Sequence, residues 1–193
     1  MGAAAHWCPP ILFRTIEVMS PPIRFAERHE LDQLARLWYD AWQDAHASIV
    51  PVELARLRTL ESFRDRLGAA LPTVRVAGSA GAPQGFCITK GDELYQLFVS
   101  AEARGSGVAA ALLADAEGGM SRAGVDTAWL ACAIGNTRAA RFYEKFGWRR
   151  AGIMVNQAET QNGLFALETW RYEKSLRGAA RVGNSSLHPE HAP

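Results

Sequence analysis

The sequence predicts an α/β protein of the mixed α+β kind, in which strands and helices alternate along one domain. Residues 93–99 are rich in aromatic and branched side chains, which predicts a strand with Tyr95, Leu97 and Val99 on one face. A glycine-rich turn then leads into an Ala- and Leu-rich segment that favours helix. Residues 127–134 are almost entirely apolar, as in a strand that is covered on both faces. This alternation predicts a sheet flanked by helices.

The N-terminal part of the chain predicts a short strand followed by two helices. Residues 23–26 form the strand, and apolar side chains at helical spacing predict a helix over residues 29–47. Residues 48–51 interrupt this pattern, with a proline suited to the first turn of the next helix. A second, continuous helix that ends at Gly68 is predicted by the spacing of Leu54, Leu57, Leu60, Phe63 and Leu67.

The rest of the chain predicts further strands and two more helices. The strands are expected at residues 73–77, 85–89, 93–99, 127–134, 152–157 and 164–172. One helix is expected over residues 106–122, with Gly124 after it as the C-terminal cap. The other helix begins after Asn136, a good N-cap, and stops at Gly147.

Both ends of the chain are expected to lie outside the folded domain. Two Pro-Pro pairs near the N-terminus bracket a short apolar patch that Arg14 and Glu17 interrupt, and this patch lacks the long apolar centre of a signal peptide. The C-terminal segment is rich in Gly, Ala, Ser, His and Pro. We expect a disordered leader over residues 1–20, one domain over residues 21–177 and a disordered tail over residues 178–193.

Bulk composition argues against several classes of protein. The net charge of the 193-residue chain is +1, which gives no support for binding to nucleic acid or to an anionic membrane. No apolar run approaches the length of a membrane span. The widely spaced Cys8, Cys87 and Cys132 argue against a disulfide framework or a metal site such as zinc, and they fit a reducing cytoplasm.

The glycine-rich segment after residues 93–99 is the clearest candidate for a binding site. Gly105 and Gly107 let a ligand approach the backbone closely, and the helix N-terminus that follows favours anions, phosphates above all. Arg104 adds a positive charge beside them. The segment is not a P-loop, because the Lys-Ser/Thr pair is absent.

Two other interpretations of this glycine-rich segment are a dinucleotide-binding loop and a helix entry that binds no ligand. The spacing fits the loose G-x-G-x-x-A pattern of dinucleotide-binding proteins. Five residues separate Val99 from Gly105, however, whereas a Rossmann loop leaves its strand almost directly. The next strand also ends in Gly135 and Asn136 instead of an acid that would bind ribose. In the second of these interpretations, the glycines serve only the geometry of a helix entry.

Two segments resemble sequence motifs of the GNAT family of N-acetyltransferases, and they occur in the same order as in that family. Residues 104–109 resemble the family's Q/R-x-x-G-x-G/A coenzyme A loop, and residues 93–99 resemble its central strand. Residues 136–148 resemble its second signature, Asn-x6-Tyr-Glu-Lys-x-Gly-Phe. The resemblance covers about residues 23–176 and implies the GNAT fold, a mixed, largely antiparallel sheet of about seven strands with helices on both faces. It also implies that the central strand and its successor run parallel and splay apart to admit coenzyme A.

The resemblance implies roles for individual residues. Acetyl-CoA, the cosubstrate, would be bound by Phe98, Val99, Arg104, Gly105, Ser106, Gly107, Val108, Ala109 and Asn136. Tyr143 matches the tyrosine of the second signature, and its neutral phenol could protonate the departing thiolate. Glu93 begins the central strand, where some family members carry a Glu that acts as the general base. A core tyrosine and a solvated carboxylate at a strand end are the plainer interpretations of these two residues.

In GNAT proteins, the first helices fold over the acceptor site. The candidates that would line it here are Trp38, Tyr39, Asp40, Trp42, Asp44 and His46. The two tryptophans lie on an apolar stripe that equally predicts core packing, the aspartates could be solvated, and the histidine could be structural.

Together, these features predict an acetyl-CoA-dependent N-acetyltransferase that transfers the acetyl group to a primary amine by direct attack in a ternary complex. The acceptor, a small molecule or a peptide amine, is left open by the sequence. A non-catalytic acyl-CoA-binding or regulatory module is the alternative, and the retention of Tyr143 and Glu93 favours the enzyme. A nicotinamide enzyme ranks third because of the loop spacing. Dimers are common in the family, and a homodimer is compatible with this chain.

Overall fold

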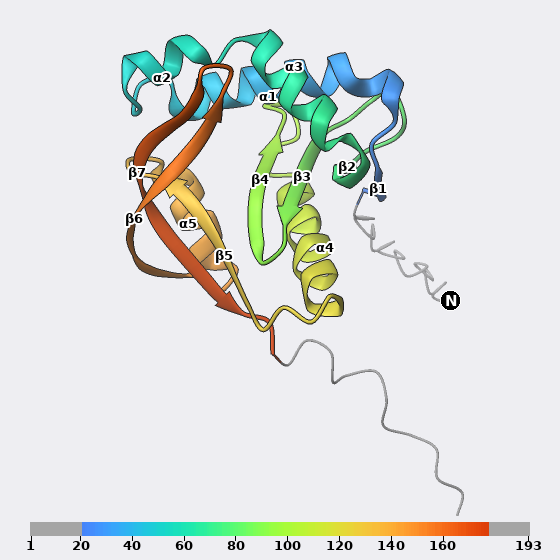
Figure 1. Ribbon diagram of the computed structural model, residues 1–193. Coiled ribbons are helices and arrows are strands. Elements are labelled where there is room, and N and C mark those ends of the chain that lie inside the picture. The colour runs from blue at the N-terminus through green and yellow to red at the C-terminus, as the bar shows by residue number, and fades with distance from the viewer. Residues whose placement is uncertain (1–20, 178–193) are drawn as a thin grey trace, which may run out of the picture.

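The computed structural model describes residues 21–177, which form one seven-stranded sheet with helices on both faces (Figure 1). The strands are β1 (Ile23–Phe25), β2 (Arg75–Ala77), β3 (Gly85–Lys90), β4 (Glu93–Val99), β5 (Thr127–Ala133), β6 (Arg149–Thr160) and β7 (Gly163–Ser175). Their order is β1-β2-β3-β4-β5-β7-β6, and all neighbours are antiparallel except β4 and β5. The predicted mixed, largely antiparallel sheet is therefore confirmed. The predicted leader (1–20) and tail (178–193) lie outside the described residues.

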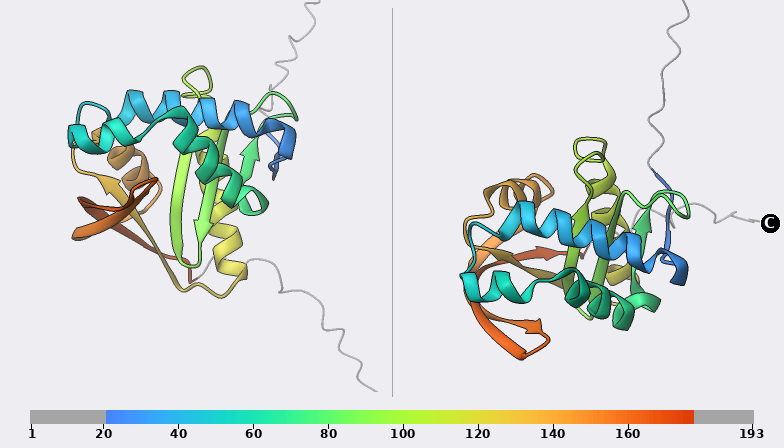
Figure 2. Two further views of the ribbon diagram at one scale, coloured as in Figure 1. Left: turned by 45° about the horizontal axis from the view of Figure 1, so that its top comes forward. Right: turned by 90° about the horizontal axis from the view of Figure 1, so that it is seen from above.

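The helices divide between the two faces of the sheet. They are the short 3-10 helices η1 (Arg28–Glu30) and η2 (Leu71–Thr73), and the α-helices α1 (Leu31–His46), α2 (Val52–Leu57), α3 (Leu60–Ala70), α4 (Val108–Arg122) and α5 (Thr137–Lys145). Figure 2 shows α1, α2 and α3 grouped together, with α4 and α5 across the sheet from them. Both faces of the central strands are therefore covered by helices.

The chain between α1 and β2 departs from the prediction, because the single helix expected over residues 54–67 is two helices. Thr59 has an extended backbone, and its side chain accepts a hydrogen bond from the backbone N–H of Ser62 at 3.2 Å, which caps α3. The preceding Arg58 has φ −92° and ψ 64°, which are not helical angles. Gly68, expected as the stop, lies inside α3.

β4 and β5 diverge from a single point of contact. In the described part of the chain, their only paired residues are Glu93 and Trp129, at the start of β4 and near the start of β5. β3, by contrast, pairs along the whole length of β4. Figure 1 shows β4 and β5 opening like a V from the end where they meet. The prediction of a parallel, splayed pair of strands is confirmed.

β4 also carries a β-bulge, which the sequence pattern did not indicate. The register of β3 against β4 shifts between Ile88 and Thr89, so that Tyr95 is an extra residue on β4. Leu97 and Val99 pack in the core under α4, whereas Tyr95 packs on the opposite side, toward α1 and α3. The prediction that Tyr95, Leu97 and Val99 share one face is therefore wrong, because the bulge reverses the alternation at Tyr95.

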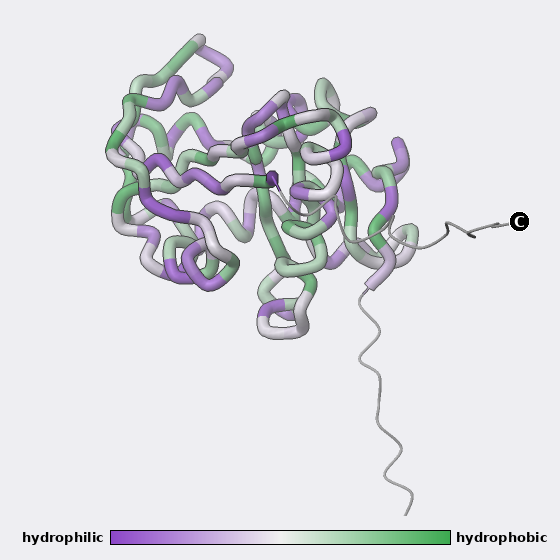
Figure 3. Tube along the Cα trace, turned by 90° about the horizontal axis from the view of Figure 1, so that it is seen from below, coloured by the Kyte–Doolittle hydropathy of each residue, from purple (hydrophilic) through white to green (hydrophobic). Residues whose placement is uncertain are grey.

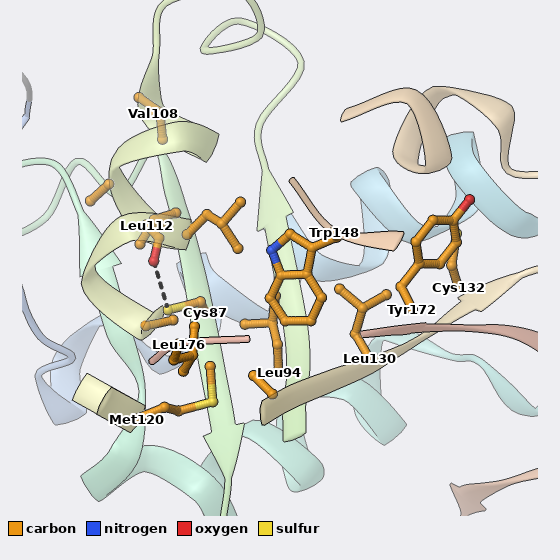
Figure 4. Packing of buried hydrophobic residues seen from close by; sticks show 14 of the residues in the cluster. Cys87, Leu94, Val108, Leu112, Met120, Leu130, Cys132, Trp148, Tyr172 and Leu176 are labelled. Atoms are coloured by element: carbon orange, nitrogen blue, oxygen red, sulfur yellow. Dashed lines mark hydrogen bonds between the residues drawn. The ribbon is translucent and has the colours of Figure 1, made fainter. Parts of the chain in front are cut away.

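Two hydrophobic cores fix the helices on either side of β4. The core under α4 and α5 contains Leu112 and Trp148 (Figure 4), and the core under α1 and α3 contains Trp38 and Phe63. All four side chains are at most 1% exposed, and burial of each contributes about 1.5–3 kcal/mol. Figure 3 shows hydrophobic segments concentrated along the central strands. The two cores thus anchor α1 and α4 on opposite faces of the sheet.

Candidate active site

A cleft of about 510 Å³ lies where β4 and β5 diverge. This volume is typical of small-molecule sites, which span about 300–1,000 Å³. One side of the cleft, here called the α4–α5 side, is lined by the glycine-rich loop, the start of α4 and by α5. The other, the α1–α3 side, is lined by the end of α1, the α2–α3 region and the β6–β7 hairpin. The opening between the strands therefore connects the two faces of the sheet.

The loop before α4 presents unused backbone donors to the α4–α5 side. Gly105 and Gly107 have φ angles of +79° and +91°, which glycine adopts readily and other residues do not. Within residues 21–177, no acceptor is found for the backbone N–H groups of Gly105, Gly107, Val108, Ala109 and Ala110. These donors and the positive end of the α4 dipole together suit a phosphate group.

Not every residue of the predicted coenzyme A loop faces the cleft with its side chain. Gly105, Gly107 and Ala109 line the cleft. Val108 is 1% exposed and packs in the core, and the Ser106 hydroxyl donates to the backbone carbonyl of Ala103 at 2.6 Å. The side chains of Ser106 and Val108 therefore shape the loop, and α4 begins at Val108 instead of Ser106.

Asp44 ties the two sides of the cleft together. Its carboxylate pairs with Arg138 of α5 at 2.7 Å and with Arg104 of the loop at 2.9 Å. The hydrogen bond from Arg138, helped by the charge of Arg104, holds the pKa of Asp44 below its ordinary value. Asp44 therefore stays ionised and is a poor proton acceptor. Although predicted as a pocket residue, Asp44 does not line the cleft but positions two arginines that do.

α5 brings Asn136 and Tyr143 to the α4–α5 side, and both line the cleft. The Asn136 side chain caps α5 by accepting a hydrogen bond from the backbone N–H of Ala139 at 3.1 Å. The Tyr143 ring packs against Phe142 and Trp148, at centroid distances of 5.4 and 6.1 Å. Burial raises the pKa of Tyr143 above its ordinary value, so the phenol keeps its proton and can donate it.

Glu93 lines the cleft at the point where β4 and β5 meet. Within the described residues, its carboxylate forms no ion pair. Burial is the main cause of the raised pKa of Glu93, and the charges of Asp92 and Glu159 raise it further, against the opposing charges of Lys90 and Arg171. A carboxylate of raised pKa is a stronger base, which suits the acceptance of a proton from an amine.

His46, in the last turn of α1, is a second candidate for the base. Its ring stacks on Trp42 at a centroid distance of 5.3 Å and lies 6.0 Å from the ring of Phe98 on β4. Burial lowers the pKa of His46 to about 4, so the ring is neutral at pH 7. Nδ1 lies 3.3 Å from the Trp42 carbonyl, and in the tautomer that donates to this carbonyl, Nε2 can accept a proton. Trp42, His46, Phe98 and Val99 all line the cleft.

Three residues predicted near the acceptor site lie elsewhere. Trp38 is 1% exposed and packs against Phe63 and Phe86, at centroid distances of 4.8 and 5.4 Å. Tyr39 packs edge-on against Phe63 at 6.2 Å, and Asp40 is exposed. None of the three lines the cleft, because only the C-terminal end of α1 reaches it.

Sequence reasoning missed four polar residues on the α1–α3 side, namely Arg58, Arg66, Tyr95 and Glu159. Arg66 Nη2 donates to the Tyr95 hydroxyl at 2.8 Å, and that hydroxyl donates to the Glu159 carboxylate at 2.7 Å. Arg58 Nη1 donates to the Glu159 backbone carbonyl at 2.5 Å, across 101 positions of sequence. The only local signal was Thr59, a favourable N-cap that could have placed Arg58 in a link between helices.

The buried cysteines offer no nucleophile for a covalent step. Burial raises the pKa of the Cys87 thiol and that of the Cys132 thiol to about 12, so both remain protonated at neutral pH. Among residues 21–177, His, Cys, Asp and Glu side chains form no group of three that could hold a metal ion. In the same residues, the helices are too short or too polar to cross a membrane.

Comparisons with known proteins agree with this geometry. The model of the acetyltransferase (GNAT) family matches residues 30–148. A GCN5-related N-acetyltransferase from Rhodopseudomonas palustris has a similar structure, with a TM-score of 0.64 and 20% identity over 81% of this chain and 96% of that one. An N-acetyltransferase from Staphylococcus aureus Mu50 has a TM-score of 0.62 and 19% identity, over 81% of this chain and 98% of that one. The search of curated proteins found no match.

A third similar structure contains a ligand. The PaiA N-acetyltransferase from Thermoplasma acidophilum, solved in complex with coenzyme A, has a TM-score of 0.55 and 21% identity, over 81% of this chain and 99% of that one. At such identities, the structural matches show that the fold is shared. The family model matches well over half of the chain, from the start of α1 to Trp148, and includes the loop, β4 and α5. The chain therefore belongs to the GNAT acetyltransferase family.

Proposed function

We propose that this protein is an acetyl-CoA-dependent N-acetyltransferase, which acetylates a primary amine by direct attack in a ternary complex. One observation carries the proposal. The unused amides of the α4 loop, Tyr143 and Glu93 all line the same cleft, with Glu93 at the point where β4 and β5 meet. Membership of the GNAT family supports acyl transfer, and the coenzyme A complex of the Thermoplasma acidophilum protein supports the choice of donor.

The α4–α5 side is suited to the donor. The free amides from Gly105 to Ala110 would hold the diphosphate of coenzyme A, with Arg104 and Arg138 adding positive charge. Beyond Glu93, the edge of β4 that faces β5 has no strand partner in the described chain. Backbone groups alternate between the two edges of a strand, and the Ser100 N–H donates to Gln84 on the β3 side. The backbone of Phe98 therefore faces β3, and the N–H of Val99 lies on the free edge, available to the pantetheine arm and the thioester carbonyl.

The reaction needs both a base and an acid. A primary amine has a pKa near 10.4 and is mostly protonated at neutral pH, so a base must remove a proton. Glu93 takes this proton, directly or through a water, and the neutral amine nitrogen then attacks the thioester carbonyl carbon and forms the C–N bond. As the C–S bond breaks, Tyr143 donates its phenolic proton to the departing thiolate, the nitrogen releases its second proton to solvent, and solvent reprotonates Tyr143. Each such group typically contributes about 10²–10⁴-fold to the rate.

A thiol-release assay with acetyl-CoA and a panel of amines tests the proposal. We expect at least one amine to stimulate the release of free coenzyme A, with formation of the N-acetyl product confirmed by mass spectrometry. A protein that binds acetyl-CoA tightly but acetylates no amine would instead be the non-catalytic acyl-CoA-binding module.

A further inference from the structure

We infer that the amine acceptor carries an anionic group, a carboxylate or a phosphate, which Arg58 and Arg66 bind on the α1–α3 side of the cleft. The inference rests on the proposed acetyl transfer and narrows its acceptor to small amines with an acidic group, such as amino acids. It starts from two arginines that line the cleft and have no carboxylate partner within residues 21–177.

Within the described residues, Arg58 is a buried cation that no carboxylate contacts. Its side chain is 5% exposed, and its Nε atom has no hydrogen-bond partner within the described residues. In the part of the chain that the structure describes, its guanidinium makes one hydrogen bond, to a neutral group, the Glu159 carbonyl, at 2.5 Å. No carboxylate of residues 21–177 lies within 4.0 Å of it. Burial of an unpaired charge is costly, so the site is incomplete without an anion.

Arg66 is in the same situation on the next helix. Its Nε atom is buried and has no partner among residues 21–177, and its Nη2 donates to the neutral phenol of Tyr95 at 2.8 Å. The guanidinium lies over the ring of Trp38, 4.6 Å from its centroid. This stacking, together with the Tyr95 hydroxyl, fixes the guanidinium in place while several of its N–H groups stay free.

The other charged groups on this side leave an excess of positive charge. Glu159 is already engaged, with one carboxylate oxygen 2.9 Å from Lys90 Nζ and the other 2.7 Å from the Tyr95 hydroxyl. Lys90 Nζ also lies over the Tyr95 ring, 3.6 Å from its centroid. His46 is neutral at pH 7, and Glu93 lies where the strands meet. The two arginines and Lys90 therefore outnumber the two carboxylates, Glu159 and Glu93, and Glu93 is the proposed base.

This distribution of charge matches the two ends of one substrate. A guanidinium binds carboxylate and phosphate groups through pairs of parallel hydrogen bonds. The neutral carbonyl that Arg58 contacts occupies only one of the five N–H donors of the guanidinium. We therefore place the anionic group at Arg58 and Arg66 and the amine toward Glu93 and the acetyl donor. A cationic acceptor such as a polyamine would meet repulsion from both arginines.

Matched pairs of amines test the inference. The probes are the common L-amino acids with their α-amides, O-phosphoethanolamine with ethanolamine, and a set of polyamines and aminoglycosides. We expect kcat/KM for the best anionic amine to exceed that of its neutral partner by about 10-fold or more, as for a charged hydrogen bond. The preferred pair also identifies the anion as a carboxylate or a phosphate.

Two variants of α3 show whether Arg66 contacts the acceptor. Arg66→Met keeps the apolar stem and removes the charge, and it should lower kcat/KM for the anionic amine about 10- to 100-fold, through KM, while its neutral partner changes little. Arg64→Met is the control, because Arg64 lies on the same helix, is 51% exposed and pairs with Asp32. Arg58→Met should act like Arg66→Met, with its melting temperature recorded alongside.

The outcomes separate this inference from the proposed function. Acetylation of only neutral or cationic amines would leave the acetyltransferase proposal standing and overturn the anionic acceptor. Equal losses for the anionic and neutral partners in Arg66→Met would show that the arginine only supports the fold, which also overturns the inference. Acetylation of no amine at all would refute the proposed function and this inference with it.

Discussion

Replacement of Tyr143 by Phe should separate chemistry from binding. The change removes one oxygen and keeps the ring, so the contacts with Phe142, Trp148 and Tyr172 at centroid distances of 5.4, 6.1 and 6.2 Å should survive. The hydroxyl has no partner within residues 21–177, so its loss leaves no buried group unsatisfied. We expect the free energy of unfolding to change by no more than about 0.5 kcal/mol.

The effect on turnover should be much larger than the effect on stability. If Tyr143 protonates the departing thiolate, kcat should fall about 10²-fold or more, which corresponds to about 2.7 kcal/mol of activation free energy. The affinity for acetyl-CoA should change little. Because burial raises the pKa of Tyr143, the wild-type phenol stays protonated over the working pH range, and the loss should be the same from pH 6 to pH 9.

The assay is single-turnover acetyl transfer with saturating acetyl-CoA and the best amine, so that chemistry limits the rate. Tyr39→Phe is the matched control, because Tyr39 packs in the other core and does not line the cleft. Near-normal single-turnover rates in Tyr143→Phe would refute the assignment of the acid. Lost acetyl-CoA affinity with retained turnover would make Tyr143 a coenzyme contact instead.

Three further changes test the other parts of the cleft. Ala109→Glu places a carboxylate beside the free loop amides and should weaken acetyl-CoA binding at least about 10-fold, as measured by calorimetry. The control Ala114→Glu, on the exposed face of α4, should leave the affinity unchanged. Equal affinities of the two variants for acetyl-CoA would contradict the loop site. Glu93→Gln should lower kcat about 10²-fold. It should also abolish the loss of rate at low pH, whose midpoint in the wild type lies above the ordinary carboxyl pKa because the pKa of Glu93 is raised. Full activity of this variant would assign the role of the base to His46 instead. The pKa of His46 is about 4 in the folded protein and 6.5 ordinarily, so as the pH falls the unfolded state takes up a proton on this ring before the folded state does. The contribution of the neutral ring to the free energy of unfolding is therefore full above pH 6.5 and falls by up to about 3 kcal/mol as the pH drops toward 4. Urea denaturation should show this slope flattened in His46→Gln, and an unchanged slope would contradict the burial of a neutral ring.

The α4–α5 side could be predicted because its signals are local. The strand over 93–99, the glycines that permit positive φ at Gly105 and Gly107, and the N-cap at Asn136 all act within a few residues of sequence. The splay of β4 from β5 was different, since it followed from the family resemblance and not from any spacing in the chain.

The α1–α3 side could not be predicted, because it depends on contacts between distant segments. Arg58 meets the β6–β7 hairpin 101 residues away, and no pattern around Arg58 indicates that neighbour. The bulge at Tyr95 depends on the register of β3 against β4 and turns that side chain to the opposite face from the one expected. Trp38 and Trp42 share one helical stripe, yet only Trp42 lies near enough to the end of α1 to line the cleft.

Thermal unfolding in the presence of acetyl-CoA tests the central claim most directly. A ligand at about 100 times its Kd adds about 2.7 kcal/mol to the free energy of unfolding. For a domain of this size, we predict a rise in melting temperature of about 5–10 °C for the wild type. The same concentration should raise the melting temperature of Ala109→Glu by much less. A folded wild-type protein whose melting temperature does not change with saturating acetyl-CoA would contradict the assignment of the cleft as an acetyl-CoA site.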